Sequence, residues 1–139
     1  MIGHFDGASR GNPGEAGAGA YLSDDAGNVI WETARYLGRK TNNEAEYGAA
    51  IILLEAAKER GARRLKVYGD SRLVVCQLSK RWKINLPHLR ELAEKAWRLS
   101  EGMEVSYEWV PREKNKRADR LSNEALDGAS PKKRVAGQE

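Results

Sequence analysis

The alternation of hydrophobic and polar positions changes character after residue 41 of the chain. Before that point, apolar residues alternate with polar ones or form short runs, a pattern typical of β-strands. Strands are predicted over residues 2–9, 16–22 and 29–37, with a glycine-rich loop at 7–14 and an Asp-, Gly- and Asn-containing turn at 23–28. Because these connections are short, the strands are expected to form an antiparallel meander.

After residue 41 the apolar residues recur at helical spacing. The first helix is expected to end at Gly61, as a C-terminal cap, and to begin with a capping box of Thr41 with Glu44 or of Asn43 with Glu46. Further helices are predicted over residues 73–78, 89–99 and 118–126, and strands over 65–68 and 105–110. Strands separated by helices are expected to lie parallel, so the pattern predicts an α/β fold with one mixed sheet.

Length and composition narrow the class of protein. The 139 residues predict one domain at residues 1–126, followed by a basic tail at 127–139. Cys76 is the only cysteine, which excludes a disulfide framework or a multi-cysteine zinc site and suits a reducing compartment. With no apolar run long enough for a membrane and no recognisable signal peptide, we expect a cytoplasmic monomer without an obligate protein partner. The net charge of +4 is compatible with a polyanionic partner.

Four acidic residues occupy places where the predicted elements converge. Asp6 lies near the end of the first strand, and Asp70 follows a parallel strand at its carboxyl end, where open α/β sheets place their functional crevice. Glu46 extends the apolar stripe of the first helix, and Asp119 lies near the start of the last helix. Neighbouring carboxylates repel one another unless a cation joins them, and Mg²⁺ binds such hard oxygen ligands. The four residues are therefore candidate ligands of a pair of Mg²⁺ ions.

Each of these acids also has an ordinary structural explanation. Glu46 could favour the dipole of its helix, and Asp70 could cap the helix that follows it. Asp6, beside a glycine, could belong to a turn, and Asp119 could be a solvated helix acid. Spacing alone leaves both sets of explanations open.

Four short blocks form the most specific pattern in the chain: FDGASRGNPG at residues 5–14, TNNEAE at 41–46, GDS at 69–71 and NKRAD at 115–119. Together and in this order, they resemble the type 1 ribonuclease H family over about residues 1–126. The resemblance implies a five-stranded mixed sheet with helices packed on it. It also implies a metal-dependent endonuclease that cuts the RNA strand of an RNA–DNA hybrid and leaves 5′-phosphate and 3′-hydroxyl ends.

The resemblance implies a role for each of the four acids. Asp6 would bridge two Mg²⁺ ions, with Mn²⁺ able to substitute. Glu46 and Asp70 would complete the leaving-group site, and Asp119 would complete the nucleophile site. The protein would then contribute mainly positioning and charge neutralisation.

Other matching positions are implied to contact the hybrid. The residues that match positions at the minor groove or the 2′-hydroxyls are Gly7, Asn12, Asn42 and Arg72. Thr41 matches a pocket for a DNA-strand phosphate, and Asn43 beside it could serve either strand. Capping and turn chemistry is the alternative explanation for Thr41, Asn43 and Asn12.

The chain departs from the family pattern in two places. Many members carry a histidine shortly before the last catalytic Asp, whereas residues 110–115 contain none and Arg112 is the nearest polar candidate. Since Arg cannot shuttle protons, Arg112 could orient a phosphate, help product release or be a surface charge. The basic, Trp-containing insertion of some members is also missing, as in a compact subgroup, and Trp82 could touch a backbone sugar or close the core.

Two other functions are compatible with these residues. A nuclease of the same fold could act on duplex RNA or duplex DNA, although the TNN block at residues 41–43 argues for the hybrid. A hybrid-binding module without catalysis is the second alternative, and the presence of all four acids argues against it.

Overall fold

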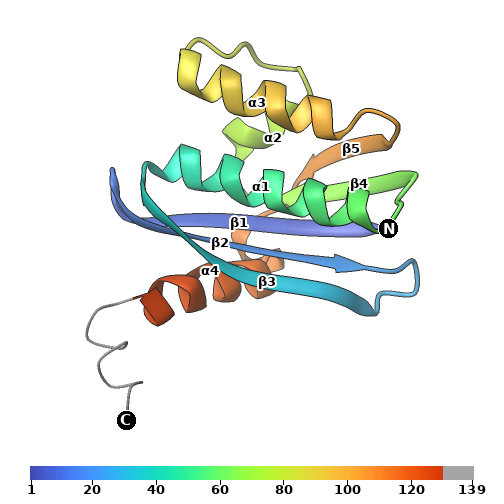
Figure 1. The fold of residues 1–139 in the computed structure, drawn as a ribbon, viewed down its shortest axis with the longest axis horizontal. Coiled ribbons are helices and arrows are strands. Elements are labelled where there is room, and N and C mark those ends of the chain that lie inside the picture. Colours follow the sequence, from blue (N-terminus) through green and yellow to red (C-terminus); the bar gives the residue numbers. More distant parts are fainter. Residues whose placement is uncertain (130–139) are drawn as a thin grey trace.

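A five-stranded sheet with helices on both faces forms the protein (Figure 1). The computed structural model describes residues 1–129. The strands are β1 (Ile2–Gly11), β2 (Gly14–Ser23), β3 (Val29–Lys40), β4 (Arg64–Gly69) and β5 (Glu104–Trp109). Their order in the sheet is β3-β2-β1-β4-β5, with β2 antiparallel to both neighbours and β4 parallel to both of its own. The predicted mixed sheet, a meander followed by parallel strands, is confirmed.

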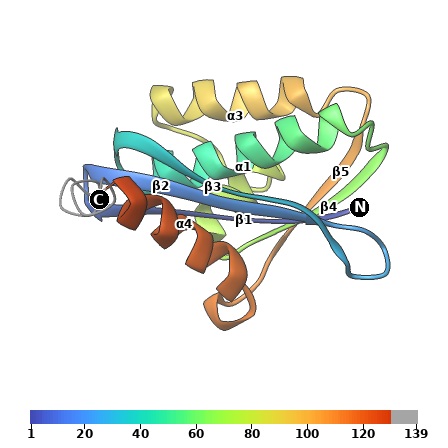
Figure 2. The same cartoon turned by 60° about the horizontal axis from the view of Figure 1, so that its bottom comes forward.

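The helices lie on opposite faces of the sheet (Figure 2). They are α1 (Asn42–Glu59), α2 (Arg72–Leu78), α3 (Pro87–Leu99) and α4 (Lys116–Ala129), with a short 3₁₀ turn, η1 (Arg112–Lys114), before α4. The core lies between α1 and the sheet, where Phe5, Leu53 and Val67 are fully buried, and α3 packs on the outer side of α1. No helix within residues 1–129 is long and apolar enough to cross a membrane.

Local hydrogen bonds explain where α1 and α2 begin. Thr41 and Glu44 form the capping box of α1, which confirms the first of the two predicted boxes. Gly61 follows the C-cap of the same helix with a φ of +69°, a conformation that glycine adopts without strain. The N-cap of α2 is Ser71, whose hydroxyl accepts from the Val74 N–H, so the alternative explanation of Asp70 as the cap of this helix is wrong.

The predicted loop at residues 7–14 is wrong, because β1 continues to Gly11 and β2 begins at Gly14. Asp6 therefore lies inside β1 rather than near its end or in a turn. Gly7 is needed for a different reason, since a Cβ at this position would overlap the backbone of Ala45 in α1. The glycine allows α1 to lie unusually close to β1.

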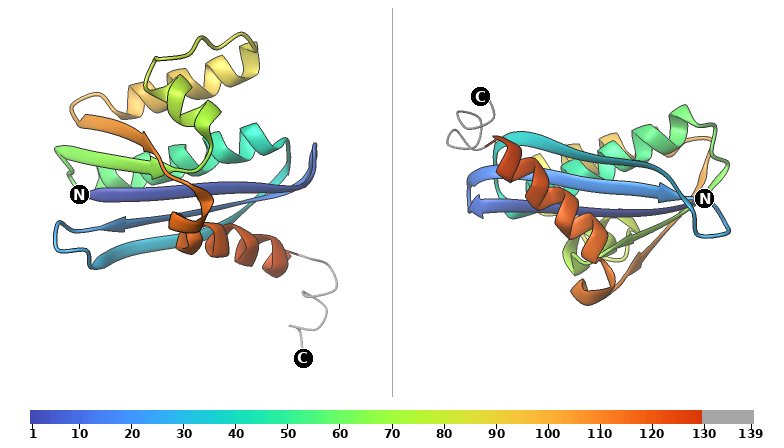
Figure 3. Two further views of the ribbon diagram at one scale, coloured as in Figure 1. Left: turned by 180° about the vertical axis from the view of Figure 1, so that it is seen from behind. Right: turned by 90° about the horizontal axis from the view of Figure 1, so that it is seen from below.

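The opposite face of the sheet carries α4 (Figure 3). Gly19 of β2 allows this close approach, because a Cβ there would overlap the carbonyl oxygen of Ala118. An ion pair of 2.6 Å between Arg117 and Glu32 of β3 also ties the helix to the sheet. The helix includes residues 127–129, which were expected to begin the tail, and the rest of the predicted tail lies outside the described residues.

Candidate active site

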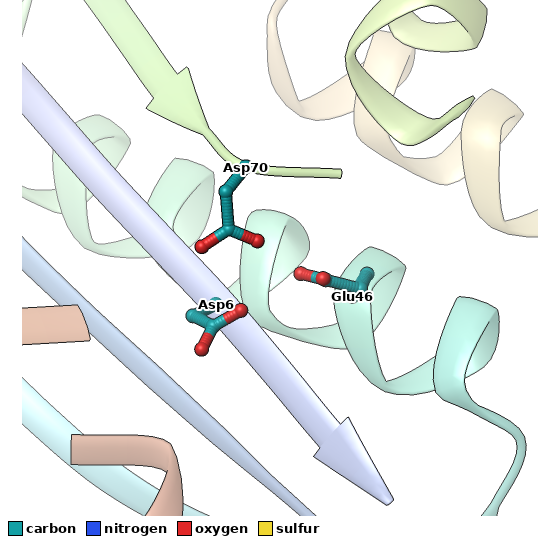
Figure 4. A group of neighbouring side chains, drawn as sticks. All are labelled: Asp6, Glu46 and Asp70. Atoms are coloured by element: carbon teal, nitrogen blue, oxygen red, sulfur yellow. The ribbon is translucent and has the colours of Figure 1, made fainter. Parts of the chain in front are cut away.

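Three carboxylates from three elements point toward one another (Figure 4). Asp6 comes from β1, Glu46 from the first turns of α1, and Asp70 from the end of β4, and one oxygen of each lies within 4.8 Å of the others. They line an open cavity of about 510 Å³, and Asp119 of α4 lines the same cavity. The charge of Asp119 also acts on Asp6 and helps to raise the pKa of that carboxyl. The structure thus brings all four predicted acids to one place.

Each of the three clustered carboxylates is held by a donor from another part of the chain. The Gly7 N–H donates to Glu46 Oε1 at 2.9 Å, which joins α1 to β1. The amide of Asn115 donates to Asp70 Oδ2 at 3.1 Å and to the Phe5 carbonyl at 2.9 Å. The Ser122 hydroxyl lies 3.3 Å from Asp6 Oδ2. These contacts fix the carboxylates before any ligand arrives.

Crowding and burial raise the pKa values of the cluster. Burial first, and then the neighbouring charges of Asp70 and Asp119, together raise the pKa of Asp6 to about 8. The pKa of Glu46 lies well above its ordinary value for the same reasons, burial first and then the charges of Asp6 and Asp70. Burial also raises the pKa of Asp70, although the Asn115 hydrogen bond and the Arg112 charge oppose this shift. Burial thus disfavours the charged form of each of the three carboxylates.

This arrangement fits a divalent metal ion. The three grouped side chains offer only carboxylate oxygens, the hard donors that Mg²⁺ and similar cations prefer. A bound cation would also relieve the repulsion that raises the pKa values of the cluster. Asp6, Glu46 and Asp70 could hold such an ion, with Asp119 available at the edge.

Arg112 and Asn123 surround the carboxylate of Asp119. Arg112 Nη2 lies 3.5 Å from Asp119 Oδ1, and both residues line the carboxylate cavity. The Asn123 amide, one turn along α4, lies 3.4 Å from the same oxygen. The Arg112 side chain is largely exposed to solvent, so the alternative that it is a surface charge stays open beside a role in the site.

Of the residues predicted to contact substrate, Gly7 and Asn42 line this cavity. Asn12 and Asn42 are also tied together, because the Asn42 N–H donates to Asn12 Oδ1 at 3.0 Å. Thr41 caps α1, and Asn43 follows in the first turn of the helix. Capping by Thr41 and the hydrogen bond of Asn12 therefore explain both residues structurally, whether or not they also bind substrate.

Arg72 and Trp82 lie on the α2 side of the molecule. The Arg72 guanidinium stacks on the ring of Trp109, the last residue of β5. Trp82 is 45% exposed, so of its two alternatives the one in which it closes the core is wrong, and contact with a backbone sugar stays a prediction.

Several polar residues of the site were not predicted as site residues. Ser9, Arg10 and Asn123 line the cavity, while Asn115 and Ser122 are fully buried beside the carboxylates. A usable signal existed for Asn123, which lies four residues after Asp119 and so on the same face of a helix. Nothing in the spacing indicated that Ser122 would point back to β1.

Comparison with known proteins identifies the family. Residues 4–125 match the family described as reverse transcriptase-like. The crystal structure of RNase H1 from the archaeon Halobacterium salinarum superposes with a TM-score of 0.89, at 46% identity, over 92% of this chain and 98% of that one. The chain belongs to the type 1 ribonuclease H family. LC11-RNase H1, crystallised in complex with an RNA/DNA hybrid, has a TM-score of 0.88 at 39% identity, covering 92% of this chain and 97% of its own.

Some relatives of this ribonuclease H chain are considerably longer. A bifunctional protein of Mycobacterium tuberculosis is 47% identical over 127 residues, which cover 90% of this chain and 35% of the relative. The chain therefore spans about a third of the length of this curated relative.

The raised pKa values predict how the stability of the metal-free ribonuclease H chain depends on pH. Between the ordinary value of 3.8 and about 8, the unfolded chain releases the Asp6 proton while the folded chain retains it. The folded state then binds more protons, so the free energy of unfolding falls as the pH rises from about 4 to 8. Thermal melts in EDTA should show the melting temperature falling over this range, and Mg²⁺ should reduce the fall.

The Asp6→Asn variant is the control for this pH effect, because it removes the titrating group without changing its shape. Its melting temperature should vary less with pH than that of the unaltered protein. A melting temperature of the unaltered protein that rises between pH 5 and 8 would contradict the assignment.

Proposed function

We propose that this chain is an endoribonuclease that hydrolyses the RNA strand of RNA–DNA hybrids and leaves 5′-phosphate and 3′-hydroxyl ends. The observation that carries the proposal is the group of three carboxylates, joined by Asp119, in an open cavity of a type 1 ribonuclease H fold. The similarity to LC11-RNase H1, which was crystallised with a hybrid, supports the choice of substrate.

Two Mg²⁺ ions are the proposed cofactors, with Mn²⁺ able to substitute. Asp6 would contact both ions, Glu46 and Asp70 would complete the leaving-group site, and Asp119 would complete the nucleophile site. When bound, such ions polarise the phosphate and lower the pKa of water. The protein's own part is to hold four carboxylates in position, through the hydrogen bonds described above from Gly7, Asn115, Ser122 and Asn123.

The surroundings of the carboxylates suit a nucleic acid backbone. Arg10 and Arg112 line the cavity, and the chain as a whole has 24 Lys and Arg against 20 Asp and Glu. Gly7 and Asn42 bring backbone and amide groups to the same cavity, and groups of this kind can both donate to and accept from a 2′-hydroxyl. Binding of the hybrid should weaken steeply as salt is added, because the basic residues displace counterions from the phosphates.

A cleavage assay tests the proposal directly. Labelled RNA–DNA hybrid, duplex RNA, duplex DNA and single-stranded RNA should each be incubated with the protein in Mg²⁺ and in EDTA. We expect the RNA strand of the hybrid to be cut only with the metal, leaving 5′-phosphate ends. Cleavage of duplex DNA without cleavage of the hybrid, or hybrid binding without cleavage in both Mg²⁺ and Mn²⁺, would contradict the proposal.

Replacing Arg112 by Ala should lower kcat by about tenfold. The guanidinium lies beside Asp119 and would add a charged contact to the phosphate of a bound hybrid, and such contacts contribute moderately to a reaction. The matched control is Arg120→Ala, which removes an Arg of α4 that pairs with Glu124 and does not line the cavity. Steady-state rates on the hybrid would decide, and a loss as large as that of an Asp70 variant would make Arg112 essential.

We infer that catalysis belongs to residues 1–126 and that the chain acts as a monomer in the cytoplasm. The buried free Cys76 fits a reducing compartment. Size-exclusion chromatography with light scattering would test the monomer, and a stable dimer would contradict it.

A further inference from the structure

Trp109 connects two residues of the α2 side of the site. Its indole Nε1 donates to the backbone carbonyl of Asp70 at 3.1 Å, and the Arg72 guanidinium lies 4.1 Å from the centre of its ring. The indole is 38% exposed, so its position is not explained by burial in the core. We propose that Trp109 is a positioning residue, which fixes the backbone of Asp70 with its N–H and orients Arg72 with its ring. This inference rests on the proposed function.

The geometry of the sheet explains why an indole at this position can reach Asp70. The parallel ladder between β4 and β5 ends with the pair Gly69 and Trp109, and the Val110 N–H still donates to the Gly69 carbonyl at 3.0 Å. Asp70 lies one residue beyond the ladder, where the chain leaves the sheet for α2. The indole N–H therefore extends the pairing of the two strands by one residue, to the residue that carries the carboxylate.

The position of the Asp70 backbone matters for the whole cluster. The carboxylate of Asp70 is held by Asn115 at 3.1 Å and lies within 4.8 Å of Asp6 and Glu46. An error of about 1 Å in such a group can lower a rate by roughly a hundredfold. With the backbone fixed by Trp109 and the side chain fixed by Asn115, Asp70 is constrained at both ends.

The ring of Trp109 has a different effect on Arg72. A guanidinium over an aromatic face is stabilised by cation–π attraction, while the N–H groups at its edge stay able to donate. Arg72 is the first residue of α2, next to the turn that carries Asp70. The stacked Arg is thus ordered in advance to donate to the phosphate or 2′-hydroxyl oxygens of a nucleic acid, and less entropy is lost when the ligand binds.

The two effects can be separated by substitution. Trp109→Phe keeps an aromatic ring and removes the N–H, so kcat should fall by about tenfold while KM changes by less than about twofold. Its apparent Mg²⁺ affinity, measured by thermal stabilisation, should fall as well. Trp109→Leu also removes the ring, and KM should then rise by roughly two- to fivefold.

A double-mutant cycle tests the link to Arg72. Arg72→Met should raise KM on the hybrid with little change in kcat, because it removes the donor and leaves the indole tether to Asp70. In the Arg72→Met background, Trp109→Leu should raise KM no further, since the stacking it removes is already absent. Independent effects of the two substitutions on KM would overturn the inference about Arg72.

Trp31→Phe is the matched control. Trp31 of β3 also carries an Arg over its ring, Arg60 at 5.5 Å, but it does not line the carboxylate cavity. Melting temperatures would show that all variants fold, and Trp31→Phe should keep the original kcat and KM. An unaltered protein that does not cut the hybrid would defeat the proposed function, whereas an active protein whose Trp109→Phe variant keeps full kcat and Mg²⁺ affinity would defeat this inference alone.

Discussion

Replacing Asp70 by Asn should lower hydrolysis of the hybrid by roughly a thousandfold or more while leaving the protein folded. The substitution removes one negative charge from the cluster that would hold the metal ions, and it preserves the shape of the side chain. The amide oxygen of the new Asn can still accept from Asn115. Because burial already disfavours the Asp70 charge, the melting temperature without metal should be unchanged or higher.

The control for Asp70→Asn is Asp25→Asn, the same change at a side chain that is 91% exposed and bound to the N-terminal ammonium group. Single-turnover rates on labelled hybrid, with circular dichroism to verify folding, are the required measurements. The Asp6→Asn variant should behave like Asp70→Asn. Substantial residual activity of either variant would show that the ligand assignment is wrong.

Replacing Gly7 by Ala should damage both stability and activity. The new Cβ would overlap the backbone of Ala45 and the N–H of Glu46, so α1 must move away from β1. We expect the free energy of unfolding to fall by roughly 1–3 kcal/mol, as for other overpacked sites. The same shift would separate Glu46 from the Gly7 N–H and from Asp6, and kcat should fall by about a hundredfold.

Gly48→Ala provides the comparison within α1. The Cβ added there would meet only the end of the flexible Leu37 side chain at 3.2 Å, and Ala favours a helix more than Gly does. Chemical denaturation and steady-state kinetics should therefore show little change. Equal losses from the two substitutions would mean that α1 tolerates no added methyl group, and the specific explanation of Gly7 would be wrong.

The topology could be predicted from the sequence because the hydrophobic period changes where the elements change. The alternation before residue 41, the capping box at Thr41 and the glycine at position 61 each have a direct local cause. The expectation of a loop at residues 7–14 was wrong because it also rested on local sequence alone. Its glycines and Asn-Pro read as a loop, whereas Gly7 serves a contact with a helix that lies almost forty residues later.

The candidate site could be predicted only in part. Their places in the predicted elements singled out the four acids, and the resemblance to the family supplied their roles. Their convergence, however, depends on contacts between elements far apart in the chain, such as the bond from Asn115 to the Phe5 carbonyl. The supporting contacts of Ser122 and Trp109 arise from tertiary packing. The sequence does not indicate which distant group a hydroxyl or an indole N–H will bond to.

Because α4 follows the other elements of the fold in the sequence, the order of synthesis affects how the site forms. Asp6, Glu46 and Asp70 all leave the ribosome before Asn115 and the α4 residues that complete their surroundings. A nascent chain that ends before residue 115 lacks Asp119 and the donors from Asn115 and Ser122. The surroundings of the carboxylate cluster are therefore complete only after α4 has been synthesised and has packed on the sheet.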